Sequence, residues 1–288
     1  MNLKHLFCLL LCLVLAAPCA AADKDPASVT ELKLRQKMSY SDVKELLSQY
    51  PNLEKVDMYA THLTASQADE LAALYPRIEF GWTLKIGTDH LVRTDAEAFS
   101  TRHRSGSPGH STKEISVLRY CKRLQALDIG HNNVDDISWI AELPDLRVLI
   151  IAINKITDLT PLAGLDKLEY LEAFSNRVTD ISPLKGLKRL MDLNIGYNRI
   201  EDFTPLYGMT QLKRLWLFRA ANRGIPGVPQ DVTKTLKEKL PQTQINWKAE
   251  PTLGGWREHP HYDVIHEMFA GIYYIPFSDS VPDDGSRP

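Results

Sequence analysis

The sequence is poor in cysteine and has no excess of charge of either sign. It has 4 cysteines in 288 residues, and Cys8, Cys12 and Cys19 all fall within the first 22 residues. Only Cys121 remains beyond them, so residues 23–288 cannot form an internal disulfide. Lysine and arginine total 34 against 36 acidic residues, a formal net charge of −2. This balance does not favour binding to nucleic acid, and no nucleic-acid partner is expected.

Long apolar runs are also missing, apart from one near the N-terminus. Residues 6–17 are apolar, a run too short for the roughly 20 residues that a membrane helix needs. Lys4 precedes it and the small residues Ala20 to Ala22 follow it. This pattern is typical of a secretory signal peptide over residues 1–22, cleaved after Ala22. We therefore predict a secreted or periplasmic protein with no membrane span.

Familiar catalytic motifs are absent as well. The sequence contains no P-loop, no GxGxxG and no GxSxG, so we expect no enzyme, no catalytic residues, no cofactor and no metal. One alternative stays open. A cluster near the C-terminus carries groups that ligate metals, and it suggests a metal-dependent hydrolase. This signal is weak, because the cluster lacks the second histidine of an HExxH helix. Its members are His259, His261, Asp263, His266 and Glu267.

What the sequence does contain is a period of 22 residues. Leucine recurs at Leu124, Leu146, Leu168, Leu190 and Leu212, and asparagine at Asn132, Asn154, Asn176 and Asn198, with Asn222 two residues late. Apolar residues alternate early in each unit, which predicts a short strand, and then recur every third residue, which predicts 3₁₀ turns. One unit buries too little apolar surface to fold alone, so the units must stack and share their faces.

The shared pattern, LxxLxΦxxNxΦxDΦxxΦxxΦ with Φ apolar, resembles the leucine-rich repeat family in its 22-residue class. Bacterial internalins and the leucine-rich regulatory subunit of protein phosphatase 1 use that class. The resemblance implies an α/β solenoid, with short parallel strands on the concave face and 3₁₀ or helical turns on the convex face. It also implies that the asparagine amides bond backbone groups of neighbouring turns. The flanking segments resemble those of secreted bacterial leucine-rich repeat proteins.

The regions around the repeats are interpreted as caps for the ends of the solenoid. Proline-terminated helices are expected at 41–49, 64–74 and 232–240, and a further short helix at 262–269. The expected organisation is a signal peptide at 1–22, an N-terminal α/β cap at 23–88, a loop at 89–114, repeats at 115–222, and a C-terminal cap and tail at 223–288.

The third, fifth and seventh positions of each unit point to the concave face, and the eighth lies at its margin. Many of these positions are apolar or aromatic, where a solvated strand face is polar, and arginines stand among them. Aromatic side chains with arginine are typical of an interface centre. The predicted ligand-binding surface consists of Val148, Ile150, Tyr170, Glu172, Phe174, Asp192, Tyr197, Arg214, Trp216, Phe218 and Arg219.

The leading hypothesis is thus a non-enzymatic module that binds a protein, or a peptide or glycan, through this concave face. Three alternatives remain. A cap, the 89–114 loop or the C-terminal tail can fold across the face and bury it. The protein can be an envelope component that associates with copies of itself. The histidine cluster can serve the hydrolase described above.

Overall fold

The computed structural model describes residues 25–101, 109–219 and 224–277, which form two compact units. The first unit ends at Asp95 and the second begins at Ala96, a few residues beyond the expected boundary at residue 88. The predicted signal peptide and Asn222 lie outside the described residues. No helix in the described part of the chain is long and apolar enough to cross a membrane.

The N-terminal unit is a four-stranded sheet with the order β1-β2-β3-β4. The first three strands are parallel and the fourth is antiparallel to β3. Two helices connect the parallel strands, as crossovers of parallel sheets require. The elements are η1 (Pro26–Ser28), β1 (Glu31–Lys33), α2 (Tyr40–Leu47), β2 (Lys55–Leu63), α3 (Ala65–Leu74), β3 (Glu79–Ile86) and β4 (His90–Arg93).

The start of each helix follows from a hydroxyl side chain. Thr64 and Gln67 form a reciprocal capping box that opens α3, and the helix predicted over 64–74 is confirmed there. For α2, Ser39 rather than Ser41 accepts a bond from the backbone amide of Asp42. The helix therefore begins and ends slightly before the predicted range.

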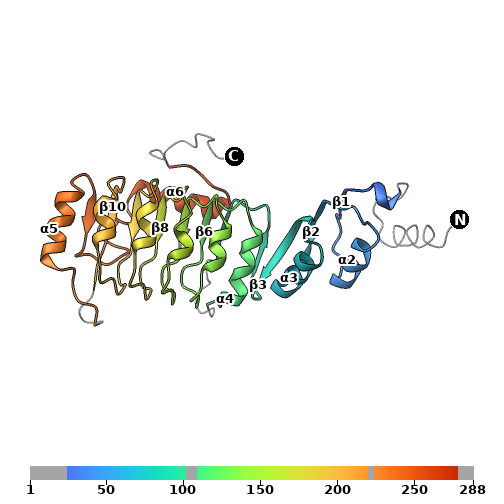
Figure 1. The fold of residues 1–288 in the computed structure, drawn as a ribbon, viewed down its shortest axis with the longest axis horizontal. Helices are drawn as coiled ribbons and strands as arrows, with labels where there is room; N and C mark the ends of the chain where they lie inside the picture. Colours follow the sequence, from blue (N-terminus) through green and yellow to red (C-terminus); the bar gives the residue numbers. More distant parts are fainter. Residues whose placement is uncertain (1–24, 102–108, 220–223, 278–288) are drawn as a thin grey trace. The chain divides into compact units, whose positions relative to one another are not determined.

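The second unit is a solenoid of stacked turns, and its strands form a seven-stranded parallel sheet with the order β11-β10-β9-β8-β7-β6-β5 (Figure 1). The register is unbroken, so one leucine of each repeat meets its equivalent in the next. The strands are β5 (Ala98–Ser100), β6 (Ala126–Asp128), β7 (Val148–Ile150), β8 (Tyr170–Glu172), β9 (Asp192–Asn194), β10 (Arg214–Trp216) and β11 (Gln244–Asn246).

The opposite side of the solenoid consists of short 3₁₀ turns and helices. These are α4 (Thr112–Ile115), η2 (Ser116–Tyr120), η3 (Ser138–Glu142), η4 (Thr160–Leu162), η5 (Ser182–Gly186), η6 (Thr204–Gly208) and α5 (Gln230–Lys239). The α/β solenoid fold expected from the 22-residue period is therefore confirmed.

Polar ladders join the turns as the resemblance implied. The Nδ2 atom of Asn154 donates to the carbonyl of Ile129 in the preceding turn at 2.9 Å, and Asn176 and Asn198 repeat this bond one turn later each. On the other side, Asp158 accepts from the amide of Thr160 in its own turn at 2.7 Å. These side chains satisfy backbone groups, so their recurrence is structural.

The interval 89–114 differs from the expected loop. Its described residues include β4, β5 and α4, and β5 adds a strand to the edge of the solenoid sheet beside β6. The Gly, Ser and Pro content that indicated a loop is concentrated at 102–111, of which residues 102–108 lie outside the described residues.

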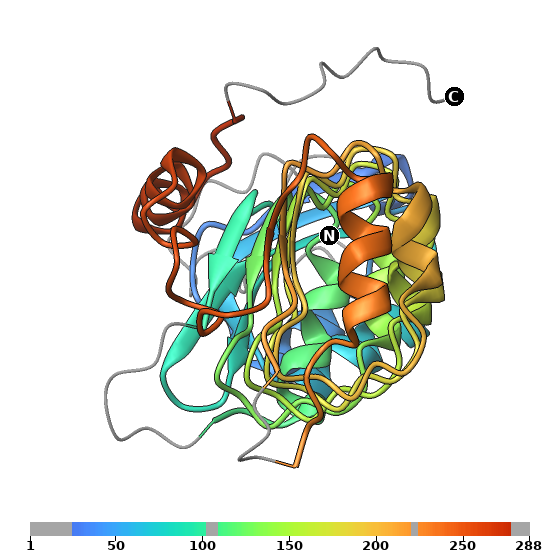
Figure 2. The same ribbon diagram turned by 90° about the vertical axis from the view of Figure 1, so that its left-hand side faces the viewer.

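The C-terminal segment returns to the sheet after β11. Its last helix, α6 (Pro260–Gly271), lies on the strand side of the solenoid, across the sheet from α5 and the 3₁₀ turns (Figure 2). Residues 249–277, called the C-terminal cover below, are therefore positioned against the concave face.

Candidate functional site

The strand register brings the predicted concave-face residues together. Val148, Tyr170, Asp192 and Arg214 are successive partners across β7 to β10. Ile150, Glu172 and Trp216 belong to the parallel row two residues further along the strands, in which Asn194 stands at β9. The positional part of the prediction therefore agrees with the structure.

The expected exposure of this face is corrected by the structure. Nine of the eleven predicted residues are buried, among them Trp216 and Tyr170 at 0% exposure. Phe218 and Arg219 are half-buried. The buried residues are Val148, Ile150, Tyr170, Glu172, Phe174, Asp192, Tyr197, Arg214 and Trp216. Apolar side chains of this density do not stay in water when a segment of the same chain can cover them, and the C-terminal cover does so.

The aromatic residues of the face pack against one tryptophan of the cover. The Trp256 ring centroid lies 5.1 Å from that of Trp216 and 5.4 Å from that of Tyr170. Ile265 and Met268 of α6 belong to the same buried cluster. The cover therefore completes a second hydrophobic core on the concave side of the sheet.

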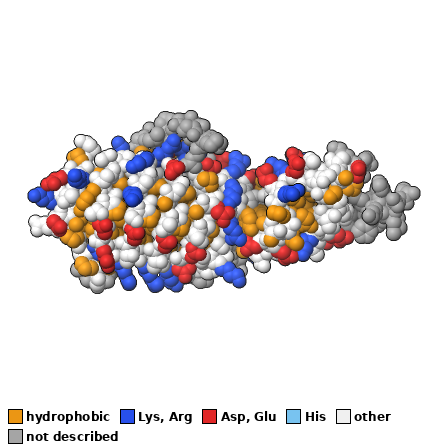
Figure 3. Space-filling model, viewed as in Figure 1, with side chains coloured by type: hydrophobic (Ala, Val, Ile, Leu, Met, Phe, Trp, Pro, Cys, Tyr) orange, Lys and Arg blue, Asp and Glu red, His pale blue; other side chains and the backbone are white. Residues whose placement is uncertain are grey.

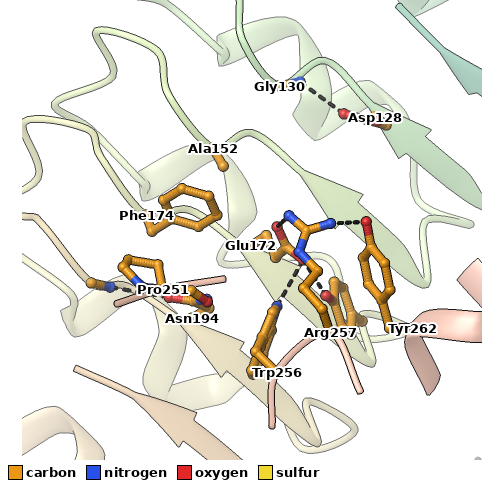
Figure 4. Close-up of polar contacts among 12 residues, drawn as sticks. Asp128, Gly130, Ala152, Glu172, Phe174, Asn194, Pro251, Trp256, Arg257 and Tyr262 are labelled. Carbon is orange, nitrogen blue, oxygen red and sulfur yellow. Dashed lines mark hydrogen bonds and ion pairs between the residues drawn. The ribbon is translucent and has the colours of Figure 1, made fainter. Parts of the chain in front are cut away.

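Glu172 is the polar centre of this contact. Its carboxylate accepts from Trp256 Nε1 at 2.8 Å and from Arg257 Nη2 at 3.1 Å, and it also accepts from the Tyr170 hydroxyl. Figure 4 shows Trp256 and Arg257 directed at Glu172. Burial and the neighbouring carboxylate raise the pKa of Tyr170 well above its ordinary value, which keeps that hydroxyl a donor.

Asp192 forms the second polar centre. Arg214 donates to it through Nε at 2.9 Å and Nη2 at 2.7 Å, and His261 of α6 contacts Oδ2 through Nδ1. Burial alone would raise the pKa of Asp192, but the bonds and charges of Arg214 and His261 outweigh it and lower the pKa below its ordinary value. The buried carboxylate is therefore held ionised between two cationic or donor groups.

Backbone groups anchor the start of the cover. Asn194 Nδ2 donates to the Pro251 carbonyl at 2.8 Å, and Trp216 Nε1 donates to the Leu253 carbonyl at 3.0 Å. A Cβ added to Gly196 would lie 3.0 Å from the Pro251 ring. The concave face and the cover are thus matched atom by atom rather than loosely apposed.

The histidine cluster has structural uses in this arrangement. His259 is the N-cap of α6, and its Nδ1 accepts from the amide of His261. His261 turns inward to Asp192, while His266 and Glu267 are exposed. The cluster does not bring three ligand atoms within reach of one ion, so the geometry gives no support to the hydrolase alternative.

The eighth positions of the repeats lie where each strand ends, and none of them belongs to the buried cluster that the cover forms with the sheet. The eighth positions form a row there, called the margin row: His131, Ile153, Ser175, Tyr197 and Arg219. Each of the first four has a positive φ between 52° and 59°. Their amides donate to the next turn, as Ile153 does to the Phe174 carbonyl at 2.9 Å. Ile153 is 37% exposed.

The cover residues that complete the site were missed as partners of the concave face. Trp256, Arg257 and His261 follow no repeat, and Trp256 lies 84 residues from Glu172 in the sequence. The signal that pointed to them was indirect, because Val148 and Ile150 are apolar at positions that an open strand face would fill with polar residues.

Comparisons with known proteins agree with the repeat fold. Residues 122–164 and 166–208 match the family model described as Leucine Rich repeats. No curated protein matches the chain. Among solved structures, an internalin (InlF) of Listeria monocytogenes is 19% identical with a TM-score of 0.42, over 84% of this chain and 81% of that one. Internalin C2 of the same species is 23% identical with a TM-score of 0.34, over 65% and 80%. A leucine-rich repeat protein of Leptospira interrogans is 15% identical with a TM-score of 0.39, over 81% and 59%.

Proposed function

Since residues 122–164 and 166–208 are leucine-rich repeats, we propose that the chain is a secreted, non-enzymatic protein-binding module whose ligand contacts the margin row rather than the concave sheet. Leucine-rich repeat solenoids commonly bind proteins, and their stacked turns provide an extended rigid surface. The concave sheet is occupied by the chain's own cover. The accessible part of the predicted surface is Phe218 and Arg219, and Arg219 is the last member of the margin row.

One observation carries the proposal: Ile153 is an exposed, β-branched residue with a φ of 56°. A left-handed backbone costs an L-residue about 1–2 kcal/mol, and a β-branched side chain is among the least suited to it. Asparagine or glycine would relieve this strain. Since Ile153 remains 37% exposed, burial within the chain does not fully offset the cost, whereas burial against a partner would.

Other members of the margin row show why Ile153 stands out. Tyr197 has a φ of 52° but is 7% exposed, and its ring packs edge-to-face on Phe218 at 5.2 Å. His131 belongs to a residue type that is enriched in this conformation. Backbone strain that contacts within the protein do not offset is a feature of binding and active sites. Within this row Ile153 shows such strain most clearly.

The half-buried end of the row supplies directed donors. Arg219 stacks its guanidinium over the Phe203 ring at 5.7 Å, and its Nε is buried without a hydrogen-bond partner. Burial lowers the pKa of Arg219. Aromatic and arginine side chains are typical of residues that dominate binding energy.

The test is the variant Ile153→Asn. It is expected to raise the free energy of unfolding by about 1 kcal/mol, because asparagine tolerates the left-handed conformation, and to abolish capture of the partner from native extracts. A merely structural role would give the gain in stability without the loss of capture. That result contradicts the proposal.

Leu74→Gln is the matched control, because Leu74 is also an exposed apolar residue, at 52%, but lies at the end of α3 in the other unit. It should leave capture unchanged. If Leu74→Gln and Ile153→Asn reduce capture equally, the captured proteins bind exposed apolar surface without specificity, and the margin row is not the site.

A further inference from the structure

A column of cations runs beside the margin row. The tenth position of three successive repeats is Lys155, Arg177 and Arg199, and all three side chains are exposed. Their amides donate to the preceding turn at 2.8 Å, as Arg177 does to Ile156, so the three residues follow the stack at about 5 Å per turn. Figure 3 shows lysine and arginine side chains scattered over the surface of the repeats, with several at their lower edge in that view.

These cations have no ion pair or side-chain hydrogen bond within the described part of the chain. The charge of Lys155 is a minor influence that lowers the pKa of Asp135, after the hydrogen bond from Thr112. The edge where the strands begin is different. There Lys122 binds Glu142 at 2.8 Å and Lys167 binds Asp145 at 3.2 Å. The column thus keeps like charges stacked and unneutralised, which is unfavourable unless an anion binds.

On this basis we propose that the margin recognises an acidic segment of its protein partner, with carboxylates on Lys155, Arg177 and Arg199 and apolar side chains on Ile153. This rests on the proposed function and specifies the chemistry of the partner. The column lies two residues beyond the margin row in each repeat, so the two rows run in parallel. An acidic peptide with interspersed apolar residues matches both rows at once.

The exposed side chain of Ile153 separates a peptide from a sulfated glycan. A glycan supplies anions but has no aliphatic side chain to cover Ile153. The guanidinium groups of Arg177 and Arg199 suit carboxylates because they can form bidentate charge-assisted bonds. Arg219 stands at the eighth position of the next repeat, and its buried Nε is one further donor without a hydrogen-bond partner.

The experiment titrates the full chain with three probes: a short synthetic peptide alternating glutamate and leucine, the same peptide with glutamine for glutamate, and heparin. The glutamate peptide is expected to bind, with an affinity that falls as salt is raised. The double variant Arg177→Gln/Arg199→Gln should weaken it roughly tenfold or more. The control Lys185→Gln/Lys188→Gln removes two exposed charges from η5 and the turn after it and should change little.

Several outcomes overturn the inference. These are tight binding of heparin without the glutamate peptide, equal binding of the glutamine peptide, and binding that ignores the arginine variants. All variants lie on the surface, and thermal unfolding checks that each is folded. If Ile153→Asn abolishes partner capture while Arg177→Gln/Arg199→Gln does not, the proposed function stands and the acidic partner is wrong. If neither variant affects capture, both fail.

Discussion

Arg214 and Asp192 face each other across β10 and β9 and form a bidentate ion pair, with Nε to Oδ1 at 2.9 Å and Nη2 to Oδ2 at 2.7 Å. Their side chains are 2% and 0% exposed. The same guanidinium lies over the Trp256 ring at 4.4 Å and donates to the Trp256 carbonyl. The pair therefore connects the repeat sheet to the cover that closes it.

Arg214→Met should lower the free energy of unfolding by about 3–5 kcal/mol, because it leaves the Asp192 carboxylate buried with one partner fewer. Denaturant unfolding measures this. The double variant Arg214→Met/Asp192→Leu removes both charges and should recover a large part of the loss. A single variant that loses less than about 1 kcal/mol would show that water reaches Asp192.

The stability contribution of Asp128 should depend on pH in the opposite direction to that of Asp192. Burial raises its pKa, although bonds from Gly130 and Ser100 lower it in part. The folded state therefore holds this proton more tightly than the unfolded chain, and the contribution to stability falls as pH rises above about 4. Asp128→Asn does not ionise, so its stability relative to the wild type should increase from pH 4 to pH 7.

The matched comparison is Asp192→Asn. The folded-state pKa of Asp192 is lowered, so its contribution is present above about pH 4 and is lost as pH falls through the folded pKa. This variant should be destabilised at pH 7 and less so in acid. If both variants respond to pH in the same direction, the electrostatic description of the concave face is wrong.

Trp256→Ala should release the cover, because its ring fills the space between Trp216 and Tyr170. The expected loss is about 3–5 kcal/mol of unfolding free energy. Amide hydrogen exchange should speed up first in α6. Trp139→Ala removes a buried tryptophan from η3. It should not make amide hydrogen exchange faster in α6 than in the rest of the unit. Uniform acceleration in both variants would mean that the cover and the repeats unfold as one unit.

Ile272 ends α6 with a φ of 56° and is 61% exposed. Glycine is the usual residue at this position after a helix, because it has no Cβ to clash. Ile272→Gly should therefore raise the free energy of unfolding by about 1 kcal/mol, and with it the melting temperature. The neighbouring change Gly271→Ala should lower it, since a Cβ there would meet the Tyr273 ring. No gain from Ile272→Gly would show that its side chain is held by contacts within the protein.

The periodic part of the molecule could be predicted from the sequence, because each repeat meets the same neighbours. The leucine and asparagine ladders predicted the solenoid, and the structure shows that Cys121 is fully buried. The aspartates recur with the same step, and Asp158 and Asp180 each bond their own turn. The margin row follows the same 22-residue step, and His131, Ile153, Ser175 and Tyr197 share a positive φ.

The cover could not be placed from sequence in the same way. Trp256 and His261 reach their partners over long sequence separations. Each of these contacts occurs once, so it produces no periodic pattern in the sequence. The apolar residues at Val148 and Ile150 predicted that something covers the face, and a folded-back segment was one of the alternatives. The concave face is covered by the chain itself rather than by a partner, because Arg257, His261 and Trp256 match the carboxylates of the sheet.

The central claim is that the partner binds the margin while the cover stays closed. Hydrogen exchange of the full chain, measured with and without the captured partner, tests it most directly. The account predicts added protection around Ile153, Arg177 and Arg199 with unchanged exchange in residues 249–277. Faster exchange in those residues, together with protection of β7 to β10, would mean that the partner displaces the cover and would contradict it.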